Sequence, residues 1–339
     1  MSAMPLPMVK PTVISTFAGG GGSSLGYKWA GFEELLAIEW DKNAVETLQA
    51  NFDFPVWQRD ICSVTADEIL SFCKIQKGEL DVLDGSPPCQ GFSTAGKRNL
   101  TDERNDLFKQ FVRLIEGLQP KVFVMENVSG MIKGKMKGKF NEILQTLKST
   151  GYNVKVKLMN AMWYEVPQSR ERVFFIGVRN DLNTEPNFPK PMDRTTTAGE
   201  ALEGIANENW ELDWVNHIQD SVIYPRICKM QMDDCYDKFS PNGSGFTLRR
   251  INRNKPCWTI SKTVNHSASS DGLLHYSENR KLTISEIKRL SSFPDKYKLF
   301  GTFIQQWARI GNAVMPKMMY HIAKNIKENI LMIPEESLL

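Results

Sequence analysis

Short apolar runs alternate with amphipathic stretches over the first 185 residues of the chain. The apolar runs have the length of buried strands, and the stretches between them repeat apolar residues with the period of a helix. The pattern predicts strands at 12–17, 34–38, 55–58, 80–83, 122–125, 154–159 and 173–178, and helices at 23–30, 43–51, 66–74, 106–118 and 138–149. Such alternation predicts an α/β fold, in which a mainly parallel sheet carries helices on both faces.

The pattern changes after residue 185, where Pro186, Pro189 and Pro191 precede a run of three threonines. Periodicity is weak from there to about residue 280, and helical patterns return at 285–292 and 317–330. These last patterns are amphipathic, which favours packing against the sheet. We therefore expect a main domain over residues 1–185, completed by 301–339, and a smaller irregular domain with its hinge over residues 186–300.

The composition is that of an ordinary globular protein, with 41% hydrophobic and 24% charged residues. No apolar run is long enough to span a bilayer, and residues 1–10 lack the features of a secretory signal. These patterns predict a cytoplasmic protein without membrane contact. The six cysteines form no C-x-x-C pair and the four histidines are scattered, so neither a metal site nor a disulfide framework is expected.

Charge is distributed unevenly, although the net charge of +3 is small. Residues 181–239 contain five Lys/Arg against twelve Asp/Glu, whereas residues 240–290 contain nine against three. A basic stretch of this kind is suited to contact phosphates, but a solvated surface explains it equally well.

One cysteine is presented in an unusual way. Cys89 follows two prolines at the end of the predicted strand 80–83. The prolines fix φ and exclude helix, so the thiol is expected at the carboxyl edge of the sheet, where open α/β folds bind ligands. The alternative is that Cys89 is a small buried hydrophobic residue.

A glycine-rich segment, 17–26, follows the first predicted strand and opens a helix. Glycines let a backbone bend tightly and approach a ligand closely. Glu39 comes twenty residues after Gly19, the interval at which an acidic side chain reaches a ribose hydroxyl, and Asp60 lies just past the third strand. The pattern favours an adenosine-containing cofactor without choosing among NAD, FAD and S-adenosylmethionine; the alternatives are a simple helix-entry turn and surface carboxylates.

Two further polar segments lie at the ends of later strands. Glu126-Asn127-Val128 closes the run 122–125, and Gln168-Ser169-Arg170-Glu171-Arg172 opens the run 173–178. With Cys89, these segments are expected to bring a thiol, a carboxyl group and a guanidinium to one edge of the sheet. Taken singly, each charged residue is equally consistent with a helix-start carboxylate or a surface salt bridge.

At this point the chain closely resembles the cytosine-C5 DNA methyltransferases of bacterial type II restriction-modification systems. The resemblance is carried by the F-A-G-x-G-G loop, the P-P-C-Q-G-F-S loop, Glu126-Asn127-Val128, the Q-x-R-x-R pattern, and Gly311-Asn312-Ala313-Val314 with Pro316. It implies a Rossmann-like domain that binds S-adenosylmethionine (SAM), and a smaller domain, residues 186–300, that recognises a short sequence in double-stranded DNA. It also implies a cognate restriction endonuclease as a functional partner; we expect a monomer.

The resemblance assigns roles to the polar residues. Cys89 would add to C6 of a flipped-out cytosine, because C5 is too electron-poor to attack the methyl group directly. Glu126 would protonate N3, which requires burial to raise its pKa. Arg172, with Arg170 beside it, would hydrogen-bond the base O2.

The same resemblance implies two larger groups of residues. Those expected around the cofactor are Phe17, Ala18, Gly19, Gly21, Gly22, Glu39, Trp40, Asp60, Ile61, Pro88, Leu107, Asn312 and Val314. Those expected to contact DNA are Gln90, Ser93, Lys97, Arg98, Arg249, Arg250, Arg253, Lys255 and Lys262.

The chain departs from the family pattern at one pair of residues, and three rival functions remain open. Ser15-Thr16 stands where the family usually has Asp-Leu, which predicts weaker cofactor binding. A tRNA methyltransferase shares the proline-cysteine loop, but the Cys-Phe-Thr element of that branch is absent. A nicotinamide-dependent oxidoreductase explains only the glycine loop and Glu39, and a non-catalytic DNA-binding protein leaves Cys89 and Glu126 without a role.

Overall fold

The protein is built around a seven-stranded sheet in the computed structural model, which describes residues 10–88, 107–132, 137–239, 248–265 and 272–332. The strand order is β3-β2-β1-β4-β5-β7-β6, and β7 runs antiparallel to both of its neighbours. The strands are β1 (Thr12–Thr16), β2 (Glu33–Glu39), β3 (Val56–Gln58), β4 (Val82–Gly85), β5 (Val122–Val128), β6 (Tyr152–Asn160) and β7 (Glu171–Arg179). The predicted α/β fold with a mainly parallel sheet is confirmed.

The reversed direction of β7 decides where its polar residues lie. β1, β2, β4 and β5 are parallel, so their carboxyl ends meet at one edge of the sheet. In the β5–β7 pair, Val122 faces Val178 and Val128 faces Arg172, so β7 begins at the edge where β5 ends. Residues near the start of β7 therefore join those at the ends of the parallel strands.

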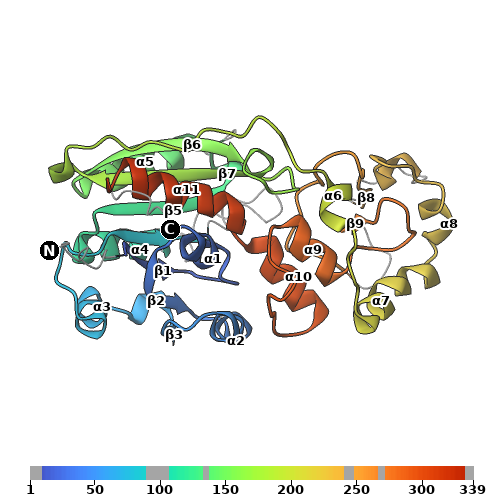
Figure 1. Ribbon diagram of the computed structural model, residues 1–339, viewed down its shortest axis with the longest axis horizontal. Helices are drawn as coiled ribbons and strands as arrows, with labels where there is room; N and C mark the ends of the chain where they lie inside the picture. The colour runs from blue at the N-terminus through green and yellow to red at the C-terminus, as the bar shows by residue number, and fades with distance from the viewer. Residues whose placement is uncertain (1–9, 89–106, 133–136, 240–247, 266–271, 333–339) are drawn as a thin grey trace, which may run out of the picture.

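Helices cover both faces of the sheet, as the alternation of strand side chains requires (Figure 1). The helices of this part are α1 (Gly22–Trp29), α2 (Lys42–Asn51), α3 (Ala66–Cys73), α4 (Leu107–Leu118) and α5 (Lys137–Ser149). Each differs from its predicted range by one residue at one end, or at both ends for α1. Neighbouring strand residues point to opposite cores: Val13 packs with the α1 side, and Ile14 packs with the α4 side.

The C-terminal helix returns to the first helix of the chain. α11 (Pro316–Asn329) lies alongside α1 on one face of the sheet (Figure 1). The contact is close because α1 carries a glycine there: a Cβ atom on Gly26 would lie 2.6 Å from Met319 Cβ and 2.7 Å from the Pro316 carbonyl oxygen. The predicted return of the last helix to the sheet is confirmed.

The segment after β7 forms small elements at one end of the molecule, on the right in Figure 1. These elements are α6 (Ala198–Leu202), α7 (Asn209–Asn216), α8 (Tyr224–Ile227), β8 (Arg249–Arg250) and β9 (Leu273–Leu274). A separate apolar cluster around Ile227, Tyr236 and Leu274 supports this end. The elements are short and weakly periodic, which is why the sequence pattern predicted only an irregular region.

Two helices connect this end to the main sheet. α9 (Ile284–Leu290) was predicted, whereas α10 (Phe303–Asn312) was not. Ile287 and Trp307 belong to the same apolar cluster as α1 and α11, so packing is continuous across residues 284–323. The domain limits at residues 186 and 300 stay predictions. No helix of the described residues is both long and apolar enough to span a membrane.

Candidate functional site

The glycine loop is a tight turn between β1 and α1. Phe17, Gly19 and Gly21 all have left-handed backbone conformations, with φ of 53°, 55° and 75°. Gly22 starts α1 directly against the C-terminal segment: a Cβ atom there would lie 2.0 Å from the Val314 carbonyl oxygen. Position 22 therefore accepts only glycine, and Val314 forms one wall of the turn.

Glu39 holds this loop to the end of β2. Its carboxylate is buried and accepts the backbone N–H of Gly19 at 2.7 Å and those of Trp40 and Asp41 at 2.9 Å. It is therefore not a surface carboxylate, which was one of the alternatives. The backbone N–H of Ala18 donates to the Ile38 carbonyl, which fixes the loop to the same strand.

The side chains after β2 and β3 are available to a ligand. Trp40 is 76% exposed, so its ring is not part of the apolar core. Asp60 is exposed and caps a short 3₁₀ turn by accepting the N–H of Cys62 at 2.9 Å. Ile61 is buried beneath that turn. The structure thus brings these residues to neighbouring strand ends, as the sequence predicted.

Four other predicted cofactor positions lie in different elements. Asn312 ends α10, Val314 follows it, Leu107 begins α4, and Pro88 follows β4. Leu107 is half-buried and packs against the apolar core on the α4 side of the sheet.

Ser15 and Thr16 lie beneath the glycine loop rather than facing outwards. Both are buried at the end of β1. The Thr16 hydroxyl donates to the Asp84 carbonyl at 3.0 Å, which ties β1 to β4. The two residues that depart from the family pattern are therefore buried inside the protein.

Glu126 and Arg172 form a buried ion pair at the strand-end edge. Arg172 Nε lies 2.8 Å from Glu126 Oε1, and both side chains are largely shielded from solvent. Burial raises the pKa of Glu126 above its ordinary value, while Arg172 and then Arg170 act in the opposite direction. The pair therefore supplies a carboxyl group that is able to hold a proton beside a fixed guanidinium.

The proline loop is attached to the same strand end. Asn127 Nδ2 donates to the Pro87 carbonyl at 3.2 Å, so the residue after Glu126 anchors the segment that leads to Cys89. Cys89 itself lies outside the described residues, as do Gln90, Ser93, Lys97 and Arg98.

Arg170 differs from its predicted role as a base contact. It is 1% exposed, and its guanidinium donates to the backbone carbonyls of Ile260, Gly311 and Ala313 at 2.9, 2.7 and 3.3 Å. These bonds hold the start of β7 to the turn between α10 and α11. The Q-x-R-x-R pattern alone does not distinguish an inward from an outward guanidinium.

Gln168 is a structural residue whose role the sequence reasoning did not identify. Its amide nitrogen donates to the Ser291 hydroxyl at 3.0 Å, and its amide oxygen accepts the Ile260 N–H at 3.1 Å. Gln168 is the first residue of the Q-x-R-x-R pattern, and that pattern was the sequence signal that could have pointed to its role.

Arg250 corrects one of the predicted DNA contacts. It is 3% exposed and donates to the carbonyls of Ile227, His275 and Glu278, as well as to the Asn279 side chain. A guanidinium with these partners ties together the segments around the apolar cluster of Ile227, Tyr236 and Leu274, and it is not free to reach a phosphate. The count of basic residues did not reveal this, because it carries no information on burial.

The other basic residues of this region remain at the surface. Arg249 stacks on Trp258 with 4.5 Å between the guanidinium carbon and the ring centroid, and Trp258 is 40% exposed. Arg253 and Lys262 are exposed, and Lys255 pairs with Asp233 at 2.7 Å. Trp258 was not among the predicted contacts, although an aromatic residue within a basic stretch is a recognisable signal for nucleic-acid binding.

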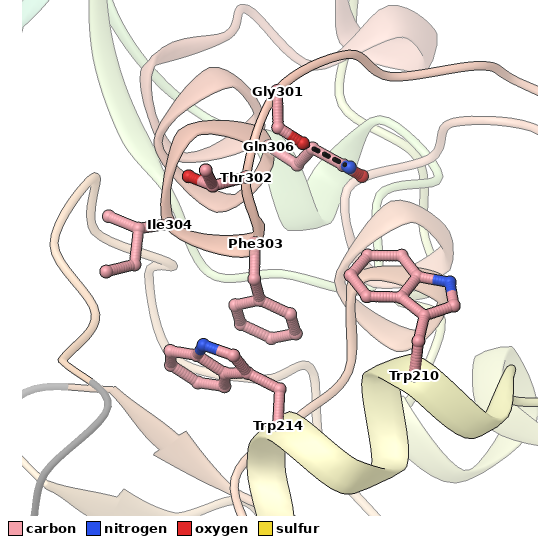
Figure 2. A pocket seen from close by; sticks show the side chains of 7 residues that line it. All are labelled: Trp210, Trp214, Gly301, Thr302, Phe303, Ile304 and Gln306. Atoms are coloured by element: carbon pink, nitrogen blue, oxygen red, sulfur yellow. Dashed lines mark hydrogen bonds between the residues drawn. The ribbon is translucent and has the colours of Figure 1, made fainter.

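A separate hollow of about 570 Å³ lies between α7 and the start of α10. Figure 2 shows Trp210 and Trp214 of α7 on one side and Phe303 on the other. The Trp214 and Phe303 rings stack with centroids 3.7 Å apart. None of the candidate residues lines this hollow. Among the residues that the structure describes, no group of three or more His, Cys, Asp or Glu is arranged to hold a metal ion.

Comparisons with known proteins agree on one family. The family model described as C-5 cytosine-specific DNA methylase matches residues 11–328. Type II methyltransferase M1.HphI of Haemophilus parahaemolyticus is 36% identical over 93% of this chain and 86% of its own length. Type II methyltransferase M.XorII of Xanthomonas oryzae pv. oryzae is 31% identical over 97% of this chain and 87% of its own.

Two solved structures extend this agreement to the fold. A putative DNA modification methyltransferase encoded within an E. coli prophage has a TM-score of 0.76 and 25% identity, covering 95% of this chain and all of its own. The S. pombe Dnmt2 methyltransferase, at 17% identity, has a TM-score of 0.68 and covers 94% of this chain and 99% of its own.

Proposed function

The chain belongs to the family of C-5 cytosine-specific DNA methylases, and from this premise we propose how its residues methylate cytosine in DNA. The membership confirms the family and the enzyme class that the motifs predicted, a DNA (cytosine-5-)-methyltransferase related to those of restriction-modification systems. The observation that carries the residue assignments is the buried Glu126–Arg172 pair beside the proline loop.

The residues at the ends of β1, β2 and β3 fit SAM as the methyl donor. The turn at Gly22 admits no side chain, and Trp40 offers an exposed ring face to adenine. A carboxylate has about four acceptor sites, so Glu39, which accepts three backbone N–H groups, keeps one for a ribose hydroxyl. When bound, the cofactor supplies an electrophilic methyl group.

The proposed chemistry divides the work among three side chains. The Cys89 thiolate adds to C6 of a flipped-out cytosine, and Glu126 gives a proton to N3 as charge develops on the ring. After this proton transfer Glu126 is a carboxylate, and Arg172 holds it in place. Arg172 also hydrogen-bonds the base O2. Arg170 acts as a positioning residue, since its guanidinium bonds to backbone carbonyls.

Residues 186–300 are proposed as the part that recognises a short sequence in duplex DNA. Support comes from the exposed basic residues Arg253 and Lys262, from the half-buried Arg249, and from the exposed ring of Trp258, on which Arg249 stacks. We further propose a cytoplasmic monomer with a cognate restriction endonuclease as functional partner.

The proposal is tested by transfer of labelled methyl from SAM to unmethylated genomic DNA, with tRNA assayed in parallel. Wild type is compared with Cys89→Ala, and methylated positions are mapped by bisulfite sequencing. Label on DNA at one short motif, lost in the variant, is the expected result. Label on tRNA alone, or equal transfer by Cys89→Ala, would overturn the proposal.

A further inference from the structure

The last turn of α10 places Arg309 against the glycine loop, and the chemistry above gives this residue no role. A Cβ atom on Gly20 would lie 2.6 Å from Arg309 Cγ and 3.1 Å from Arg309 Cδ, so the aliphatic part of the arginine packs on the bare Cα atom of Gly20. The Tyr297 hydroxyl donates to the Gly20 carbonyl at 2.7 Å. Two side chains from the C-terminal part of the chain therefore hold the middle of the loop.

The charged end of the Arg309 side chain binds the start of α2. Arg309 Nη2 forms an ion pair with Asp41 Oδ1, and the arginine side chain is only 16% exposed. Arg309 Nε is buried without a hydrogen-bond partner among the described residues, so the Asp41 carboxylate fixes where the guanidinium lies. Asp41 is the N-cap of α2 and accepts the N–H of Ala44 at 2.9 Å. Arg309 thus connects the glycine loop to the segment that follows β2.

Two side chains therefore bridge the glycine loop and the end of β2. Glu39 does so from β2, since its carboxylate accepts the N–H groups of both Gly19 and Asp41. Arg309 does so from α10, with its aliphatic part on Gly20 and its guanidinium on Asp41. The residue between Glu39 and Asp41 carries the exposed indole ring, so both bridges act on the spacing between that ring and the loop.

We propose that Arg309 is a positioning residue for the methyl donor: by contacting Gly20 and Asp41 at once, it holds the glycine loop at a fixed spacing from Trp40. The inference rests on the proposed function, in which SAM contacts both the loop and the Trp40 ring. A site whose parts are already in place binds its ligand more tightly, because less conformational freedom is lost on binding. Removal of the guanidinium should therefore weaken SAM binding and leave the methyl-transfer step unchanged.

The test is SAM binding to the full-length protein, measured by calorimetry for a double-mutant cycle. Arg309→Met keeps an unbranched stem but removes the charged group, and Asp41→Asn keeps a good N-cap residue but removes its charge. Each should raise Kd for SAM by about 5- to 10-fold, the low end of the couplings that act without direct contact. The double variant should raise Kd no further, because both changes remove the same ion pair. Effects that add in full, or an unchanged Kd in Arg309→Met, would overturn the proposal.

Lys42→Met is the matched control, because it removes a positive charge from the residue next to Asp41. The Lys42 side chain is 77% exposed, and its partner is Glu46 of the same helix at 3.8 Å. Its Kd for SAM should equal that of wild type, and a rise as large as in Arg309→Met would assign the effect to charge in general and contradict the inference. Arg309→Lys keeps a positive charge and should recover part of the affinity that Arg309→Met loses; no recovery would count against the ion pair.

Hydrogen exchange in the cofactor-free protein measures the order of the loop directly. The N–H groups of Ala18, Gly19 and Gly21 are hydrogen-bonded within the loop or to β2. In Arg309→Met they should exchange faster by about the factor found for Kd, and in Lys42→Met they should exchange at the wild-type rate. Faster exchange throughout the chain would show a general loss of stability and would refute a local role. If Arg309→Met does not fold, Asp41→Asn serves for both measurements.

A kinetic measurement separates positioning of the cofactor from catalysis. KM for SAM should rise in Arg309→Met by a similar factor, with kcat at saturating SAM unchanged. A lower kcat at saturating SAM would contradict a role confined to the cofactor. Failure of wild type to bind SAM would refute the proposed function, whereas hydrogen exchange would still decide whether Arg309 holds the loop.

Discussion

Replacement of Arg170 by methionine should destabilise the whole protein, because this guanidinium holds three segments together. Its donors reach the carbonyls of Ile260, Gly311 and Ala313, so it joins the start of β7 to α10 and to the segment before residue 265. Methionine has a similar length and fills the space, but it offers no donor. The three carbonyls then remain buried without their partner.

The magnitude follows from the type of bond that is lost. A hydrogen bond from a charged donor contributes about 1.5–3 kcal/mol, but three bonds from one group are not additive, and the variant also avoids the cost of burying a charge. We expect a loss of about 3–5 kcal/mol in the free energy of unfolding, because each buried carbonyl left without its partner costs about 1–3 kcal/mol and the three costs do not add in full. That loss is a large part of the stability of a typical domain.

The assay is urea unfolding followed by both circular dichroism and tryptophan fluorescence. Arg253→Met serves as the control, because Arg253 is exposed and its ring contact with Tyr276 contributes less than about 1 kcal/mol. If Arg170→Met unfolds within 1 kcal/mol of wild type (about the control's value) yet loses methyl transfer, the structural reading of Arg170 is wrong and a direct contact with the base is favoured.

Three other changes test the remaining parts of the site. Trp40→Ala should weaken SAM binding by about 5- to 30-fold in calorimetry, as expected for loss of an aromatic face worth about 1–2 kcal/mol; unchanged affinity would exclude stacking on this ring. Gly22→Ala should abolish cofactor binding, because the added Cβ atom would lie 2.0 Å from the Val314 carbonyl oxygen. Gly138→Ala is the control: a Cβ atom at that position meets no atom within 4 Å, so the variant should bind the cofactor normally. Arg249→Ala should lower DNA affinity and reduce the slope of log K against log salt by about 0.9; an unaltered slope would place Arg249 away from phosphate.

Much of the main sheet was predictable because its elements follow local rules. Apolar runs bounded by glycine or polar residues gave the strands, and the parallel order then placed Glu39 and Glu126 at one edge. The meeting of Glu126 with Arg172 required one fact that periodicity does not contain, namely that β7 runs antiparallel. The family resemblance supplied that association before the strand direction was known.

The errors have a common physical cause, which is that sequence reveals charge more readily than burial. Arg170 and Arg250 were expected to face ligands, but each is enclosed by backbone carbonyls from segments distant in sequence. The missed helix α10 is different, since Phe303, Trp307 and Ile310 repeat at helical spacing and the signal was present.

The contact of Gly22 with Val314 has a consequence for biosynthesis. The turn between β1 and α1 is made early by the ribosome, but its facing wall comes from a residue close to the end of α10, almost three hundred positions later. A nascent chain that has not reached Val314 therefore presents the turn with one side open to water. If this turn holds the methyl donor as proposed, the site is complete only after Val314 has been made, and loss of the segment around Val314 removes one wall of a site whose sequence signature stands at residues 17–26.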